Sequence, residues 1–207
     1  MPHRITLSNQ KGGVGKTTIC LHLGVALANK GKDVLLVDLD PSAYLSKHVG
    51  LETYYEEADV SLAHYLVNSG KEVSKDTIME TNVGLDIIPS NYDMRGVEDR
   101  LSSERNREMR LKMFLDKIDE DYDYTLVDSP PTLGVLYDNA IIACRNVIIP
   151  IKDEDMSVVS IHRALDEIDE IESVFGISVN ILAIIPNLVR PDGVADSTLK
   201  RLRETEG

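Results

Sequence analysis

The chain has 207 residues, of which 43% are hydrophobic, and this length suits one domain with a sizeable core. Its formal net charge of −13 excludes a broadly basic nucleic-acid-binding surface, because Lys and Arg supply the affinity for phosphates. No apolar run approaches the roughly 20 residues needed to span a bilayer, and the N-terminus has no signal-peptide pattern. We therefore expect one cytosolic domain over residues 1–207.

Short β-rich segments alternate with helical patterns along the chain. The predicted strands are mostly continuously apolar, which is typical of strands covered on both faces. They are Arg4–Ser8, Val34–Asp38, Leu85–Pro89, Tyr124–Asp128, Val147–Ile151 and Val179–Pro186. The predicted helices are Thr17–Lys30, Asn106–Ile118 and Met156–Phe175. This alternation predicts an α/β fold with a doubly wound, mainly parallel sheet and helices on both faces, which binds ligands beyond the carboxyl ends of its strands.

A glycine-rich segment joins the first predicted strand to the first helix. Its glycines allow successive amide groups to face phosphate oxygens, and the start of the helix favours anions. Lys16 is placed to reach the β- and γ-phosphates, and the Thr17 hydroxyl to ligate Mg²⁺. Gln10 stands where the usual phosphate-loop pattern has glycine, and a second lysine follows it. The segment predicts nucleotide binding by Lys11, Gly12, Gly13, Val14, Gly15, Lys16, Thr17 and Thr18.

Three carboxylates follow predicted strands. Asp128 ends an apolar strand before Ser-Pro-Pro, which suits a Mg²⁺ ligand, although an acid that only ends a strand gives the same pattern. Asp38 and Asp40 alternate after the second strand, so both face the phosphates if the backbone stays extended. Asp40 also precedes Pro41, which suits a helix N-cap. A catalytic and a capping interpretation of Asp40 therefore both remain open.

The string Asn9–Thr18 closely resembles the deviant Walker A box of the ParA/MinD ATPases, in which Lys11 is the signature lysine. Within this family, the short distance from the N-terminus to the loop resembles the small ParA type of DNA partition (segregation) ATPase. The resemblance implies a P-loop hydrolase that uses ATP and Mg²⁺ and works slowly without its partner. It continues, in order, through Val37–Pro41, Ile88–Ser90, Leu126–Pro131 and Ile149–Pro150.

The resemblance also implies roles for single residues. Asp40 positions or activates the attacking water, so that Lys11, Lys16 and Asp40 are the expected catalytic residues. Thr17, Asp38 and Asp128 are the expected metal site, with Asp38 near the water shell of the ion. Two subunits enclose two ATP molecules in a homodimer, and each Lys11 reaches into its partner's site. Asn187 matches the family position that contacts adenine, although a turn asparagine is an equal interpretation.

ParA-type proteins bind DNA without sequence preference as ATP-bound dimers, and a ParB-like centromere-binding adaptor stimulates their hydrolysis. The resemblance therefore implies plasmid or chromosome partition by a cytoplasmic protein that is nucleoid-associated when ATP-bound. A basic adaptor peptide is one interpretation of the acidic Met156–Phe175 helix, and a solvated face is the other. The candidate DNA contacts, which neighbouring acids offset, are Arg190, Lys200, Arg201 and Arg203.

Two other classes share parts of this pattern. A MinD-like membrane-associated positioning regulator would expose an amphipathic C-terminal helix, but Leu199–Thr205 is short and lacks a broad apolar face, so we do not expect membrane binding. An iron–sulfur reductase of the nitrogenase-iron-protein type requires two cysteines at a dimer axis. Cys20 lies inside the first predicted helix and Cys144 at the end of another, which does not suit such a cluster.

Overall fold

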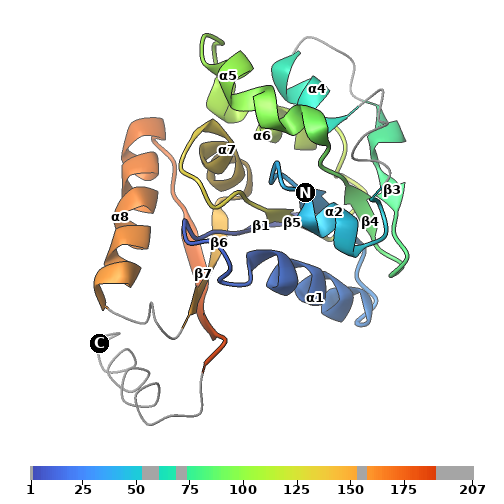
Figure 1. The fold of residues 1–207 in the computed structure, drawn as a ribbon, viewed down its shortest axis with the longest axis horizontal. Helices are drawn as coiled ribbons and strands as arrows, with labels where there is room; N and C mark the ends of the chain where they lie inside the picture. Colours follow the sequence, from blue (N-terminus) through green and yellow to red (C-terminus); the bar gives the residue numbers. More distant parts are fainter. Residues whose placement is uncertain (1, 53–60, 69–73, 153–157, 190–207) are drawn as a thin grey trace.

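The computed structural model describes residues 2–52, 61–68, 74–152 and 158–189, without the side chains of 158–160. In these ranges seven strands form one sheet in the order β3-β4-β2-β5-β1-β6-β7 (Figure 1). Every neighbouring pair is parallel except β3 with β4. The predicted α/β class with a mainly parallel sheet is therefore confirmed. The strands are β1 (His3–Leu7), β2 (Val34–Asp38), β3 (Met79–Glu80), β4 (Asp86–Ile88), β5 (Tyr124–Asp128), β6 (Asn146–Lys152) and β7 (Asn180–Asn187).

Helices cover both faces of this sheet. In Figure 1, α1 and α2 lie on one side, α4 to α7 lie on the other, and α8 stands beside α7 at the end of the sheet that β6 and β7 form. The helices are α1 (Lys16–Ala28), α2 (Tyr44–His48), α4 (Leu62–Val67), α5 (Val97–Leu101), α6 (Arg110–Leu115), α7 (Val135–Cys144) and α8 (Val158–Phe175), with 3-10 turns η1 (Lys75–Thr77), η2 (Tyr92–Gly96) and η3 (Arg107–Met109).

The packing of β2 explains why its sequence is continuously apolar. Leu35 and Val37 are buried towards α4, α5 and α6, whereas Val34 and Leu36 are buried towards α1 and α2. Because successive side chains of a strand point to opposite faces, a strand covered on both sides needs an apolar residue at every position. Gly24 allows α1 to lie close to the sheet, since a Cβ there would stand only 3.0 Å from Leu36 Cδ2.

The predicted helix Asn106–Ile118 is wrong as a single element. Asn106 has a left-handed backbone (φ 53), and the chain then forms η3 followed by the short α6. The side chain of Asn139 in α7 explains part of this break. Its Oδ1 accepts from Leu111 N at 2.8 Å, and its Nδ2 donates to Arg107 O at 2.8 Å. These are the two groups that a continuous α-helix would join to each other, so a tertiary contact replaces a helical one.

Arg4 connects the inner strand β1 to the segment after α6. Its guanidinium donates to both carboxylate oxygens of Asp119, at 2.7 and 2.8 Å, and to Asp116 at 2.8 Å. The side chains of Arg4 and Asp119 are 11% and 2% exposed, so this pair lies largely outside solvent. Thr125 Oγ1 also donates to Asp119 at 3.0 Å. The network fixes the amino end of the sheet, opposite the end at which the glycine-rich segment lies.

Candidate functional site

The glycine-rich segment forms the turn between β1 and α1. Gly13 and Gly15 have left-handed backbones, with φ of 69 and 95, where a side chain is disfavoured. Gly15 is also confined by a neighbour, because a Cβ there would stand 2.2 Å from Asn187 Nδ2. Val14 between them is buried. The backbone conformation therefore favours glycine at position 15, and a Cβ there would also displace the side-chain amide of Asn187.

Lys16 and Thr17 begin α1 at the carboxyl end of the sheet. Lys16 is buried, and its Nζ donates to the carbonyl oxygen of Asn9 at 2.9 Å. Burial lowers the pKa of Lys16, while the negative charges of Asp128 and Asp40 oppose that shift. Thr17 Oγ1 donates to Asp128 Oδ2 at 2.6 Å. The structure thus brings together residues that are 111 positions apart in the sequence.

Asp38 and Asp128 face each other across neighbouring strands. They are direct register partners at the ends of β2 and β5, and both are buried. Burial and the charge of the other acid raise the pKa of Asp128, and burial also raises the pKa of Asp38. Within the described parts of the chain, Asp128 Oδ1 is buried without a hydrogen-bond partner. A pair of buried carboxylates with an unsatisfied oxygen is a chemical environment suited to a hard cation such as Mg²⁺.

Ser46 holds one of these carboxylates in place. Its hydroxyl and backbone amide donate to Asp38 Oδ2 at 2.6 and 2.9 Å, and the same hydroxyl accepts from Ser90 N at 3.0 Å. These bonds join β2, α2 and the segment after β4. The sequence prediction missed Ser46, since no local motif marks it.

Asp40 does not cap a helix. α2 begins at Tyr44 and its N-cap is Ala43, whereas Asp40 Oδ1 accepts from Ser42 N at 2.8 Å in a local turn. The capping interpretation of Asp40 is therefore wrong for α2. Asp40 N donates to Asp38 Oδ1 at 3.2 Å, which places Asp40 next to the buried pair.

Asn187 is the last residue of β7, and its side chain contacts the glycine-rich segment rather than a turn of its own. Asn187 Nδ2 donates to Val14 O at 2.9 Å. On the other side of the segment, Asn9 Nδ2 donates to Pro150 O at 2.7 Å and Asn9 Oδ1 accepts from Lys11 N at 2.8 Å. Side-chain amides thus attach the turn to β6 and β7.

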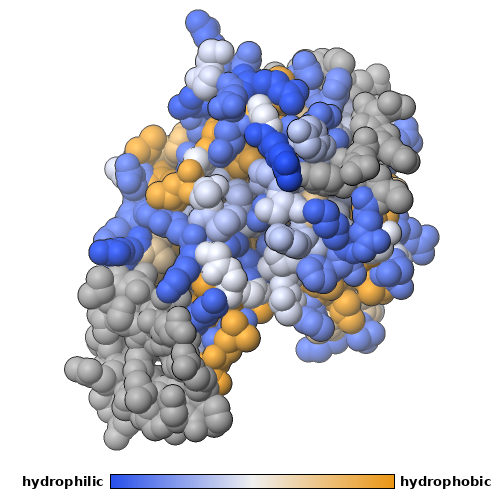
Figure 2. All heavy atoms as spheres, in the orientation of Figure 1, coloured by the Kyte–Doolittle hydropathy of each residue, from blue (hydrophilic) through white to orange (hydrophobic). Residues whose placement is uncertain are grey.

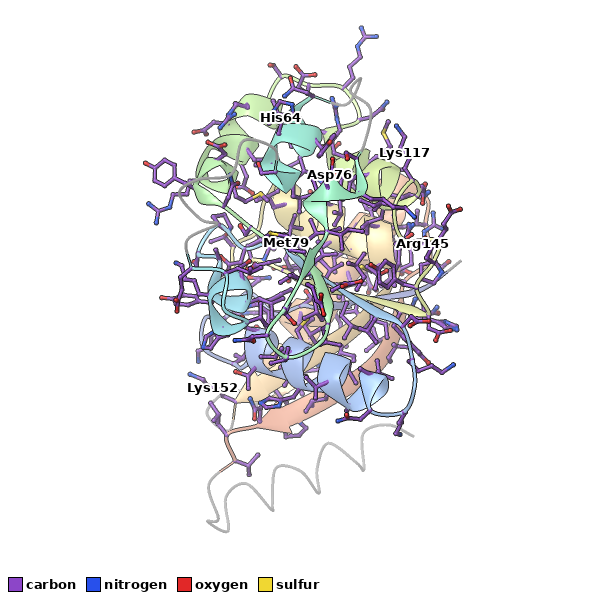
Figure 3. All side chains as sticks on the ribbon, turned by 90° about the vertical axis from the view of Figure 1, so that its right-hand side faces the viewer. His64, Asp76, Met79, Lys117, Arg145 and Lys152 are labelled. Carbon is purple, nitrogen blue, oxygen red and sulfur yellow. The ribbon has the colours of Figure 1, made fainter. Side chains whose placement is uncertain are left out.

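Lys152 is a further cation at this turn that the sequence prediction missed. It ends β6, and its Nζ lies 3.3 Å from the position that a Cβ on Gly13 would occupy. Figure 3 labels Lys152, the last residue of β6, and Arg145, which immediately precedes the strand, so the two residues lie at opposite ends of β6. Since ligands bind beyond the carboxyl ends of parallel strands, the position after Ile149-Pro150 was the available signal.

Some residues that the sequence singled out lie outside the part of the chain that the structure describes. The candidate DNA contacts Arg190, Lys200, Arg201 and Arg203, and the tail Leu199–Thr205, lie outside the described residues.

Cys20 and Cys144 are both buried free thiols. Cys20 belongs to the core beneath α1, and Cys144 to the core on the other face of the sheet. In the described ranges no group of three or more His, Cys, Asp or Glu side chains is arranged to hold a metal, and no helix is long and apolar enough to cross a bilayer.

A mainly parallel sheet whose first strand leads through a left-handed glycine turn into Lys16 and Thr17, beside two strand-end aspartates, defines a P-loop nucleotide-binding protein. A family model described as an AAA domain matches residues 3–181. The chain is 40% identical over 167 residues to the sporulation initiation inhibitor protein Soj of Bacillus subtilis, covering 79% of this chain and 64% of Soj. It is 32% identical over 203 residues to the chromosome partitioning protein ParA of Caulobacter vibrioides, covering 96% of this chain and 74% of that protein. The chain belongs to the ParA/MinD family of deviant Walker A ATPases.

Solved structures agree with this fold. Cobyrinic acid a,c-diamide synthase from Mycobacterium smegmatis, with bound ADP and magnesium, has a TM-score of 0.89 at 31% identity, covering 99% of this chain and 82% of that one. A single-residue variant of McdA from Cyanothece, in complex with ATP, has a TM-score of 0.83 at 25% identity, covering 99% of this chain and 80% of that one. The chain covers less than two thirds of the length of Soj, so further segments exist in that relative.

Proposed function

We propose that this protein is a ParA-type partition ATPase that binds ATP with Mg²⁺, dimerises around it and hydrolyses it. The observation that carries this proposal is the hydrogen bond between Thr17 and Asp128, which sets the start of α1 against a buried acidic pair. The relatives Soj and ParA, and the nucleotide complexes of the structural neighbours, support it.

The residues of the turn have distinct proposed tasks. The amide groups of residues 12–18 and the ammonium of Lys16 bind the phosphates, because a glycine turn at a helix start directs N–H groups at an anion. The Thr17 hydroxyl and the carboxylates of Asp128 and Asp38 hold the magnesium ion, which neutralises phosphate charge when bound. Asp40, beside the buried pair, positions the attacking water.

The two sides of the turn also differ in chemistry. Asp38 and Asp128 come from β2 and β5, on one side of β1, whereas Lys152 and Asn187 come from β6 and β7, on the other. We assign the acidic side to the γ-phosphate and its metal. The side with the amide of Asn187 receives the nucleoside, so Asn187 contacts the base as well as the loop.

Lys11 is proposed to act across a dimer. Its side chain is exposed at the surface of the turn, and the resemblance to deviant Walker A proteins implies that it reaches the ATP of a second subunit. The dimer would bind DNA without sequence preference, and a ParB-like adaptor would stimulate hydrolysis.

Dimerisation assays with ATP, with ADP and without nucleotide test this function. Wild type should dimerise only with ATP, and Lys11→Ala should stay monomeric while retaining ADP binding. Lys117→Ala is a matched control, because Lys117 is an exposed lysine outside the site (Figure 3). An ATP-dependent dimer of Lys11→Ala with the stability of the wild-type dimer would refute the proposed role.

A further inference from the structure

A groove of about 360 Å³ lies between the start of α7 and the C-terminal half of α8. Its walls include the apolar side chains of Tyr137, Ile171 and Phe175. At its rim, Leu133 is 54% exposed and Val174 is 68% exposed, which is high for large apolar side chains. Figure 2 shows apolar atoms gathered at the upper left, beside α7 and the upper end of α8, with hydrophilic atoms around them. A solvated groove of this kind offers a site for an apolar side chain from another molecule.

Four carboxylates line the same groove: Glu108, Asp138, Glu167 and Glu170. Arg107 forms an ion pair with Glu108 at 2.8 Å. Burial, together with the charges of Glu108 and Glu170, raises the pKa of Asp138 to about 6, against the opposing effect of Arg107. In the described parts of the chain, Glu167 Oε2 is buried without a hydrogen-bond partner. The groove therefore carries an excess of negative charge that a cationic ligand would relieve.

A hydrogen bond and a chain segment join the groove to the residues that flank the nucleotide site. The hydroxyl of Tyr137, in its wall, is hydrogen-bonded to Ser8 Oγ at 2.9 Å, and Ser8 immediately precedes the glycine-rich turn. Leu133 and Gly134, at its edge, belong to the segment that follows Asp128. Ser129 at the start of that segment donates to Leu7 O at 2.7 Å. The groove is therefore linked to the residue after β1 by the Tyr137–Ser8 hydrogen bond, and to the end of β5 by the chain segment 129–134.

We propose that this groove docks a partner segment in which Lys or Arg side chains flank an apolar residue, and that the docked segment acts on the phosphate loop through Tyr137 and Ser8. The apolar walls favour a peptide over a metal ion, and the carboxylates favour a cationic peptide over an anionic surface such as a membrane. This inference rests on the proposed function, because it assigns the site at which an adaptor would stimulate hydrolysis.

The test is a fluorescence anisotropy titration of the full chain with a labelled peptide in which arginine and lysine alternate with leucine. Two probes serve as peptide controls: one with serine in place of leucine, and one with glutamate in place of the basic residues. We expect the first peptide to bind most tightly, since it alone satisfies both the apolar walls and the acidic rim. Equal affinity of the leucine and serine peptides would overturn the proposal.

Matched variants locate the binding on α8. The double variant Glu167→Gln with Glu170→Gln removes two groove charges, whereas Asp166→Asn with Asp169→Asn removes two charges from the same helix outside the groove lining. Since exposed charge contacts contribute modestly, the groove variant should bind the peptide about fivefold more weakly, with little change in the control. An equal loss in both variants would show general attraction to an acidic protein and refute the site.

Coupling is tested by Tyr137→Phe, which removes only the hydroxyl bonded to Ser8. We expect this variant to bind the peptide within about twofold of wild type, while the ratio of peptide-stimulated to unstimulated phosphate release falls. An unchanged ratio would refute the route through Ser8. If wild type releases no phosphate at all, the proposed ATPase function fails, whereas the anisotropy titration still decides whether the groove docks the peptide.

Discussion

Single residues of the glycine turn are constrained by contacts as much as by their own conformation. Gly15 combines a left-handed backbone with the close approach of Asn187, while Gly31, after α1, has a similar backbone (φ 75) and open space around it. These two glycines therefore separate the cost of backbone strain from the cost of a steric clash.

We expect Gly15→Ala to reduce nucleotide affinity strongly and to destabilise the fold by about 2 kcal/mol, because the new Cβ is strained and also displaces Asn187. Gly31→Ala should cost about 1 kcal/mol from backbone strain alone and leave nucleotide affinity unchanged. Urea unfolding and nucleotide titration measure both effects. Equal nucleotide affinity in the two variants would show that the contact with Asn187 is unimportant.

The sequence indicated some of these residues and not others, for a physical reason. Lys16 and Thr17 follow a strand and a glycine turn, so a short local pattern is enough to find them. Ser46 and Tyr137 are hydrogen-bonded to Ser90 and Ser8, which are 44 and 129 positions away, and no local pattern encodes such pairs. Their roles depend on which strands become neighbours, so only the tertiary structure reveals them.

Among the elements, the parallel strands were the most predictable, because burial on both faces demands a continuous apolar run. The two-residue β3 was missed since so short a strand has no pattern of its own. The helix expected at Asn106–Ile118 is interrupted because the Asn139 side chain forms hydrogen bonds with Leu111 N and Arg107 O, which a continuous helix would pair with each other. Element boundaries thus depend on contacts between elements that the local sequence does not contain.

The attachment of β1 to the segment after α6 should be important for stability. Arg4→Met leaves Asp119 buried without its cationic partner, and we expect a loss of about 3 kcal/mol in the free energy of unfolding. Lys75→Met removes a surface ion pair with Asp121, at 2.5 Å, and should leave the unfolding midpoint nearly unchanged. Urea denaturation compares the two, and similar losses would contradict the importance of burial.

The start of α7 should make stability depend on pH. The folded-state pKa of Asp138, about 6, is above its unfolded value, so its protonated form favours folding at about pH 4 and that contribution is lost as the pH rises through about 6. Because Asp138 is partly solvated, we expect Asp138→Asn to stabilise the protein by only on the order of 1 kcal/mol at about pH 8.

The measurement for Asp138→Asn is the melting temperature of wild type and variant across this pH range. The two proteins should converge at low pH and separate as the pH rises. Asp169→Asn, on the exposed side of α8, controls for the change in net charge. A stabilisation of the Asp138 variant that is independent of pH would contradict the electrostatic cause.

On the scale of the whole molecule, the net charge of −13 limits how DNA can be bound. We predict retention on DNA only with ATP, and its loss between about 50 and 200 mM salt, because a few local cations must supply the affinity. The variant Lys200→Glu with Arg203→Glu should abolish retention, and Lys117→Glu should not. Equal retention with ATP and ADP at low salt would contradict this prediction.

The position of β1 between β5 and β6 has a consequence for folding during translation. Its neighbour β5 lies far along the chain, and the bond from Thr6 to Val127 spans 121 residues. A ribosome adds about 5–20 residues per second, so roughly 6 to 24 s pass between the synthesis of β1 and the synthesis of β5. The turn that holds phosphate cannot be completed earlier, since Asp128 ends β5. During translation, bound nucleotide therefore cannot stabilise the folded site until the chain has been synthesised as far as Asp128.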